Sequence, residues 1–132
     1  MHQKIADARF RLMGTGFFVR FRGNEREGGT MIKHVVCWKL YDQALGGNRE
    51  TNARLIRERL KALDEALPMM QSVEIGINSG KAPGENYDVA LICVFEGFQA
   101  LHDYKNHPEH KAFVEFVTPL SEDVVNVDFQ MS

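Results

Sequence analysis

Four stretches of the chain alternate apolar and polar residues with a period of two, the pattern that predicts β-strands. They run over residues 32–40, 73–77, 87–96 and 124–129. The third stretch differs from the others because both of its faces are apolar. A strand of that kind is covered on both sides, so we expect it in the centre of the sheet.

Helical periods separate these strands. Four apolar residues after the first strand share one helical face: Ile56, Leu60, Leu63 and Leu67. Asn48 or Thr51 can cap this helix, and Pro68 ends it. After the third strand we expect a short helix over Gln99–Asn106, which stops near Pro108, and a second short turn that leads to Pro119.

The expected order is strand, helix, strand, strand, helix, strand. This order is typical of a ferredoxin-like α+β sandwich (βαββαβ), in which a four-stranded antiparallel sheet carries its helices on one face. The opposite face would then be bare, although the predicted strands carry apolar side chains on both faces. A bare apolar sheet favours a partner, and the simplest partner is a second copy related by a twofold axis. We therefore expect a homodimer with the two sheets face to face.

Residues 1–30 differ from the rest of the chain. They carry six basic and three acidic residues, whereas residues 31–132 carry ten basic and fifteen acidic residues. Glycines flank their short apolar run, and Gly28-Gly29-Thr30 indicates a break immediately before Met31. We expect residues 1–30 to be an N-terminal extension, either disordered, an added edge strand or the product of an upstream start, and residues 31–132 to form one domain.

The composition is that of a globular protein, with 44% apolar and 26% charged residues and a formal charge of −2. This charge gives no support for nucleic-acid binding. No apolar run is long enough for a membrane span, and the N-terminus makes a poor signal peptide. Cys37 and Cys93 lie in apolar runs, which favours buried thiols in a reducing compartment unless their strands lie side by side and form a disulfide. We expect a cytoplasmic protein.

The segment from His102 to Lys111 concentrates titratable groups directly after the most apolar strand. An imidazole suits a general acid or base, and a tyrosine hydroxyl can polarise a carbonyl or hold an enolate. The first strand adds His34, the polar exception on an apolar face. Tyr104, His110 and His34 are therefore candidate catalytic residues for a proton transfer next to a carbonyl. We expect a bound ligand to contact His107 and Trp38.

The same residues also have a structural interpretation. His107, which precedes Pro108, can cap the second short helix. His110 can bond a backbone carbonyl and fix the turn, and Tyr104 can pack with its hydroxyl at a rim.

A metal site is a further interpretation of this segment. The spacing His107-x-x-His110 can place two imidazoles on one helical face, with Glu109 or Asp103 as an oxygen ligand. Pro108 weakens the helical argument, and no third ligand is placed by the sequence. We expect neither a metal nor a cofactor.

Three features together resemble the stress-responsive dimeric α/β-barrel domain family, called Dabb. They are Ile32-Lys33-His34-Val35-Val36 in the first strand, the two-sided third strand and the run Tyr104-x-x-His107-Pro108-x-His110. The resemblance covers residues 31–129. It implies a ferredoxin-like subunit that dimerises into an α/β barrel, with a cavity between sheet and helices.

Most members of the family have no assigned reaction. One plant member is a cofactor-free polyketide cyclase, and its catalytic tyrosine and histidine correspond to Tyr104 and His110, while a histidine near its active site corresponds to His34. We expect a stress-responsive homodimer that binds a small apolar or aromatic ligand. The alternatives are a cofactor-free cyclase or lyase with Tyr104 and His110 as acid and base, and a cofactor-free monooxygenase, an activity of other dimeric α/β-barrel families.

Overall fold

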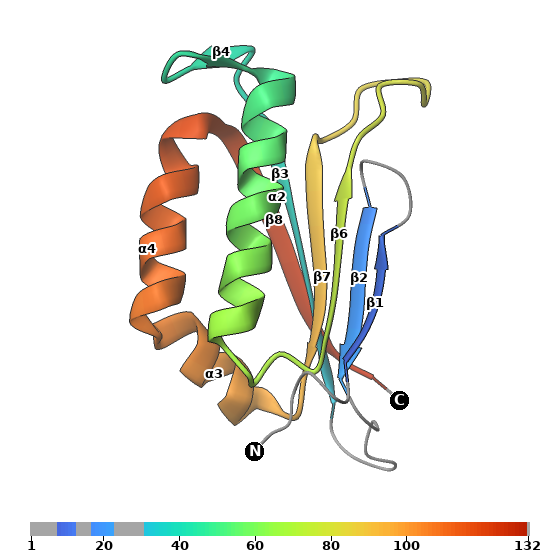
Figure 1. Ribbon diagram of the computed structural model, residues 1–132, viewed down its shortest axis with the longest axis vertical. Coiled ribbons are helices and arrows are strands. Elements are labelled where there is room, and N and C mark those ends of the chain that lie inside the picture. The colour runs from blue at the N-terminus through green and yellow to red at the C-terminus, as the bar shows by residue number, and fades with distance from the viewer. Residues whose placement is uncertain (1–7, 13–16, 23–30, 132) are drawn as a thin grey trace.

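Alternating burial along strand β3 (Ile32–Leu40) explains the layers of the molecule. In the computed structural model, which describes residues 8–12, 17–22 and 31–131, every even-numbered residue of β3 is buried and every odd-numbered residue is half-buried. The buried face lies under the helices α2, α3 and α4, whereas none of the described helices lies on the other face (Figure 1). We call this other face the bare face.

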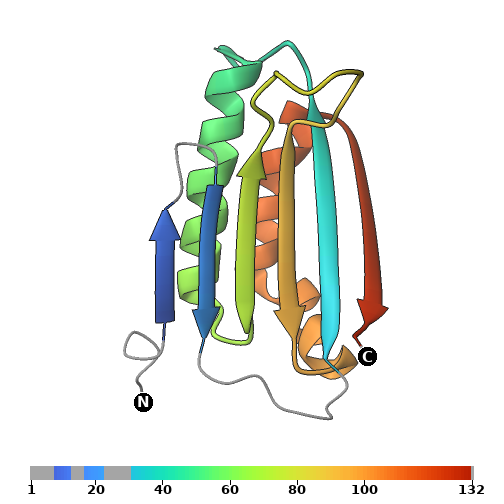
Figure 2. The same cartoon turned by 90° about the vertical axis from the view of Figure 1, so that its right-hand side faces the viewer.

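Strand β3 belongs to an antiparallel sheet of six strands in the order β1-β2-β6-β7-β3-β8 (Figure 2). The other strands are β1 (Ala8–Leu12), β2 (Phe17–Arg22), β6 (Ser72–Ile77), β7 (Val89–Phe95) and β8 (Ser121–Gln130). β7, the strand that is apolar on both faces, lies between β6 and β3 in the interior of the sheet, as predicted.

The helix layer consists of α2 (Arg49–Ala66), α3 (Phe98–Asn106) and α4 (Pro108–Val117), followed by the short 3-10 helix η1 (Thr118–Leu120). The Asn48 side chain caps α2 and accepts a hydrogen bond of 2.8 Å from the Thr51 amide. The three helices, the antiparallel sheet and their order confirm the predicted ferredoxin-like α+β fold. Among the described residues, no helix is long and apolar enough to cross a membrane.

The sheet differs from the expected four strands because β1 and β2 add a hairpin to the β6 edge. Both strands come from the predicted N-terminal extension. The other residues of that segment, 1–7, 13–16 and 23–30, lie outside the described residues, so the domain boundary at residue 31 stays a prediction. The connection between β3 and α2 contains a small hairpin of β4 (Gln43–Ala44) and β5 (Gly47–Asn48).

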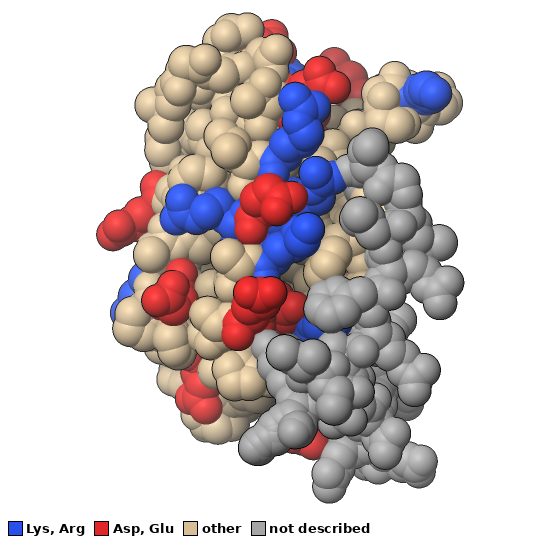
Figure 3. Space-filling model, viewed as in Figure 1, with Lys and Arg blue, Asp and Glu red and all other residues tan. Residues whose placement is uncertain are grey.

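The helix layer presents mixed charges to solvent. Basic and acidic side chains alternate along the visible face of α2 (Figure 3), and three ion pairs link them: Arg54–Glu50, Arg57–Glu58 and Lys61–Glu58. Exposed pairs of this kind contribute little to stability.

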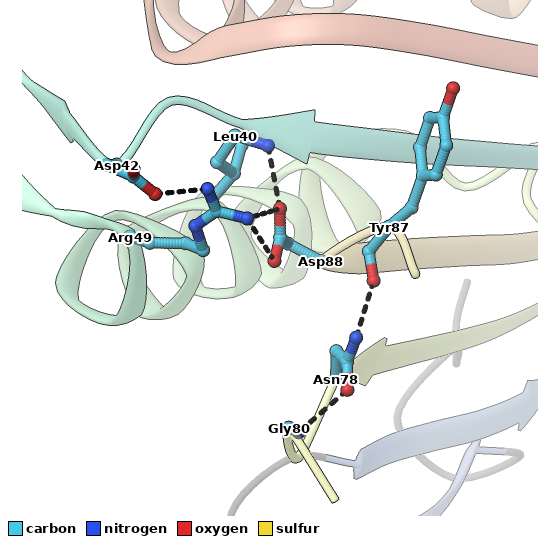
Figure 4. A network of polar contacts seen from close by, with 7 residues as sticks. All are labelled: Leu40, Asp42, Arg49, Asn78, Gly80, Tyr87 and Asp88. Carbon is cyan, nitrogen blue, oxygen red and sulfur yellow. Dashed lines mark hydrogen bonds and ion pairs between the residues drawn. The ribbon is translucent and has the colours of Figure 1, made fainter. Parts of the chain in front are cut away.

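A polar network fixes the β3–α2 connection at one end of the sheet (Figure 4). The Asp88 carboxylate accepts a hydrogen bond of 2.8 Å from the Leu40 amide and lies 3.3 Å from the Arg49 guanidinium, which also pairs with Asp42. Asn52, buried in α2, donates to the carbonyl oxygens of Ala44 and Gly47 in the small hairpin. These bonds satisfy backbone groups that the turn would otherwise leave unpaired.

The two cysteines lie on opposite faces of the sheet, although their strands are neighbours. Cys37 of β3 is opposite Ala90, and Cys93 of β7 is opposite His34. Both thiols are free. The register therefore excludes a disulfide between them within one chain.

A buried ion pair ties the N-terminal hairpin to the helix layer. Arg20 of β2 bonds both carboxylate oxygens of Asp64 in α2, and the two side chains are only 1% and 3% exposed. Arg20 also donates to the carbonyl oxygen of Met70 at 2.9 Å and lies 3.4 Å from that of Gln71. A guanidinium with these four acceptors is fully compensated, so the hairpin packs as part of the core.

We predict that Arg20→Met and Asp64→Leu each strongly destabilise the protein, because either change leaves a buried charge without this partner. Breaking such a pair typically costs about 3–5 kcal/mol in the free energy of unfolding, whereas replacing both partners with apolar residues is often close to neutral. Urea denaturation of the two single variants and the double variant measures the coupling. Arg54→Met, which removes an exposed pair, is the control, and losses in the single variants no larger than in this control would contradict the prediction.

Candidate functional site

Three elements bring the candidate residues together. The alternation of β3 points His34 under the helices, α3 carries Tyr104, and α4 carries His110. The chain breaks between α3 and α4 at His107, whose Nδ1 accepts a hydrogen bond of 3.1 Å from the Glu109 amide, and Pro108 begins α4. Proline suits the first position of a helix because it has no amide hydrogen to satisfy.

Across this break, the rings of Tyr104 and His110 lie against each other in a tilted arrangement. The ring centroids of Tyr104 and His110 are 4.5 Å apart, and the His34 ring lies 5.8 Å from the Tyr104 ring in an edge-to-face arrangement. Phe95 supports Tyr104 from the sheet, with 4.8 Å between ring centroids. Three titratable side chains from three elements therefore form one cluster.

The cluster lies at the wall of a cavity of about 420 Å³ between the sheet and the helices α3 and α4. Most of the wall is apolar, and it includes Trp38, whose ring packs edge-to-face on Phe113 at 5.8 Å. Most polar groups gather in two places: His34, Tyr104, Lys105 and His110 in one, and Thr118, Ser121, Glu122 and Asp123 in the other. Asn126 of β8 is a further polar residue of the wall. A cavity of this size and composition suits a small, largely apolar molecule.

Asp128 of β8 is the hydrogen-bond partner of His34. It lies opposite His34 in the sheet, and one of its carboxylate oxygens contacts His34 Nδ1. The other oxygen lies 3.1 Å from the ammonium of Lys105. The carboxylate can only accept, so Nδ1 carries the proton and Nε2 is the accepting nitrogen of neutral His34.

His110 has the same tautomer for a different reason. Its Nδ1 lies 3.3 Å from the backbone carbonyl oxygen of Lys105, which can only accept. Nε2 of His110 is therefore the nitrogen with a free lone pair. No hydrogen bond to Nε2 of either His34 or His110 is present within the described residues.

Burial shifts the protonation of all three groups. It lowers the pKa of His34, although Asp128 acts in the opposite direction, and it also lowers the pKa of His110. Burial raises the pKa of Tyr104 well above its ordinary value. For Asp128, burial would raise the pKa, but hydrogen bonds from His34 and Lys105 hold it below its ordinary value. These shifts favour a protonated Tyr104 and neutral His34 and His110 near neutral pH.

The structure brings together four of the five predicted site residues. Tyr104, His110, His34 and Trp38 all line the cavity. His107 is absent from the cavity wall and caps α4. Within the described part of the chain, no three His, Cys, Asp or Glu side chains lie together as a metal site would require.

The sequence interpretation missed Asp128 and Lys105. Lys105 lies inside the segment from His102 to Lys111, but its partner Asp128 lies on β8, far away in the sequence. Asp128 has only one local signal, a carboxylate between the apolar residues Val127 and Phe129 of a predicted strand. Its role depends on the register between β3 and β8, which no local pattern encodes.

Comparison with known proteins agrees with this fold. The family model of the stress responsive A/B barrel domain matches residues 32–131. A dimeric ferredoxin-like protein of unknown function from Thermobifida fusca is 26% identical, with a TM-score of 0.70 over 82% of this chain and 97% of that chain. A dimeric protein of unknown function from Bacteroides fragilis is 28% identical, with a TM-score of 0.66 over 76% and 96% of the two chains.

A more distant similarity is to the hydroxynitrile lyase from Passiflora edulis. It is 16% identical, with a TM-score of 0.65 over 79% of this chain and 95% of that chain. At this identity the similarity shows the fold alone. No curated protein matches the chain.

We predict that acidification destabilises the fold below the ordinary histidine pKa of about 6.5. His34 and His110 have lowered pKa values in the folded protein, so the unfolded chain binds more protons in this pH range. The free energy of unfolding therefore decreases as the pH decreases. Asp128, with a pKa lowered from 3.8, adds a separate loss in more acidic solution. Urea denaturation between about pH 7.5 and pH 5 measures the first effect.

The matched variants of this experiment are His110→Gln and His102→Gln. His110→Gln should weaken the pH dependence of the free energy of unfolding. His102→Gln, which removes an exposed histidine, should leave this dependence unchanged. Equal pH dependence in both variants and the wild type would show that His110 does not contribute.

Proposed function

We propose that this chain, which belongs to the stress-responsive A/B barrel (Dabb) domain family, binds a small apolar or aromatic molecule in the cavity between its sheet and its helices. The observation that carries the proposal is the convergence of His34, Tyr104 and His110 on a largely apolar cavity of about 420 Å³. Trp38 and Phe113 offer the ligand flat aromatic surfaces. The proposed ligand has an apolar body and a polar group, such as a carbonyl, that reaches the histidines.

A second candidate function is a cofactor-free acid–base reaction of the cyclase or lyase type. The supporting observation is that Tyr104 and His110 are in contact and have pKa values shifted in opposite directions. His110 Nε2 would take a proton from a carbon next to a carbonyl, and the electron pair would move onto the carbonyl oxygen. The Tyr104 hydroxyl would donate a hydrogen bond to the resulting enolate. A monooxygenase activity has only the fold to support it.

We also propose that the chain forms a homodimer through the bare face. The related proteins from T. fusca and B. fragilis are described as dimeric. On this face β8 exposes three large apolar side chains, Val125, Val127 and Phe129, beside the half-buried Val35 and Ile92. A second copy seated there would remove this contiguous apolar surface from water. The free thiols of Cys37 and Cys93 support a reducing location such as the cytoplasm.

The ligand proposal predicts a stabilisation that depends on the cavity. The wild type is screened by thermal shift against aromatic and polyketide-like acids. A ligand at about one hundred times its dissociation constant stabilises the folded protein by about 2.7 kcal/mol, which raises the melting temperature by several degrees. Tyr104→Phe and His110→Gln should reduce the shift, whereas Tyr41→Phe, an exposed tyrosine outside the cavity wall, should not.

A compound that stabilises the wild type and all three variants equally would place binding elsewhere. A panel in which no compound moves the wild-type melting temperature would count against ligand binding. Conversion of a stabilising compound by the wild type, without added cofactor and lost in Tyr104→Phe, would establish the second function.

The dimer proposal predicts that Val127→Asp yields a monomer, because it places a carboxylate in the centre of the proposed interface. Light scattering over a range of concentrations measures the mass. Leu55→Asp is the control, since Leu55 is 48% exposed on α2 and Val127 is 53% exposed on the bare face. A wild type that remains monomeric at high concentration would exclude this interface.

A further inference from the structure

Lys105 contacts the cavity cluster in two ways that the proposed function does not use. Its ammonium lies 3.1 Å from the Asp128 carboxylate that holds His34, and its backbone carbonyl lies 3.3 Å from His110 Nδ1. Its side chain is 41% exposed and lines the cavity. Lys105 therefore contacts the partner of His34 through its side chain and is itself the partner of His110 through its backbone.

Lys105 is also the only lysine or arginine in the described wall of the cavity. The carboxylates of that wall, Glu122 and Asp123, belong to the other polar group at the start of β8. The Lys105 ammonium and the Asp128 carboxylate are therefore the charged groups that act on His34, and on His110 the Lys105 ammonium acts together with His34. A cation in that place opposes the protonation of both imidazoles.

We propose that Lys105 is a positioning residue of the cavity: its ammonium fixes the Asp128 carboxylate against His34 and keeps both cavity histidines in their neutral, proton-accepting form. The proposal rests on the proposed function in one respect, because neutral histidines matter only if they meet a ligand in the cavity. It adds a residue to that site whose role is to control the groups that meet the ligand.

Several groups besides Lys105 surround the two histidines, and the test must separate the effect of Lys105 from theirs. His34 meets Asp128 from β8, Lys105 and Tyr104 from α3 and the neighbouring Cys93 from β7. His110 meets Tyr104 and the Lys105 carbonyl from α3, and the charge of His34 on β3 also acts on it. Burial is the main cause of the lowered pKa of both histidines, the charge of Lys105 lowers both further, and Asp128 raises the pKa of His34.

The experiment is an NMR titration of the histidine ring protons in the full-length protein, with resonances assigned by His→Gln variants. Lys105→Met removes the ammonium and keeps a chain of similar length, and Lys105→Gln is a second neutral variant. Lys105→Arg restores the charge. Lys111→Met removes an exposed lysine from α4 and is the matched control.

In both neutral variants the pKa values of His34 and His110 should rise by several tenths, and this rise should shrink as added salt screens the ammonium. Lys105→Arg should return both values to those of the wild type, and Lys111→Met should leave them there. Unchanged titration in Lys105→Met and Lys105→Gln, or the same rise in Lys111→Met, would overturn the proposal. The titration needs no ligand, so a failed ligand screen and a failed titration are separate results.

Discussion

The helix layer covers only one face of the sheet, and this constraint gives each strand two different surroundings. On β3 the even-numbered residues lie beneath the helices and the odd-numbered residues lie on the bare face. The same strand therefore places His34 in the apolar wall of a cavity and Val35 on the proposed interface. A register slip of one residue would exchange these two sets, so the cavity and the interface depend on the same alternation.

Buried polar groups on the covered face join the sheet to particular helices. The antiparallel register aligns Arg20, Val73, Cys93, His34 and Asp128 in one row across the sheet. At one end of this row Arg20 forms an ion pair with Asp64 of α2. At the other end the Asp128 carboxylate contacts both His34 and Lys105 of α3. The buried Arg20–Asp64 pair compensates two charges that burial would otherwise penalise, whereas the Lys105–Asp128 pair is partly exposed. Both ends of the row thus connect the sheet to a helix, α2 through Asp64 and α3 through Lys105.

The parts of this structure that follow from local pattern were predictable, and the parts that follow from register were not. Strand β3, the interior position of β7 and the cap at Asn48 each depend on residues close together in the chain. Arg20 and Asp128 each take their role from a residue far away in sequence, Asp64 in one case and His34 in the other. A short-range interpretation can only treat such groups as surface charges, because the pairing that buries them does not appear in any window of the sequence.

The segment between α3 and α4 shows why the structural and the functional interpretations of its histidines are not alternatives. His107 caps α4, and this cap together with Pro108 ends one helix and starts the next. After this break the His110 ring of α4 lies 4.5 Å from the Tyr104 ring, and its Nδ1 reaches the Lys105 carbonyl. That contact leaves Nε2 of His110 as the accepting nitrogen beside a buried tyrosine that keeps its proton. The helix cap at His107 therefore helps to position His110, the candidate acid–base residue. A substitution of His107 would change the geometry of the cavity, although His107 does not line it.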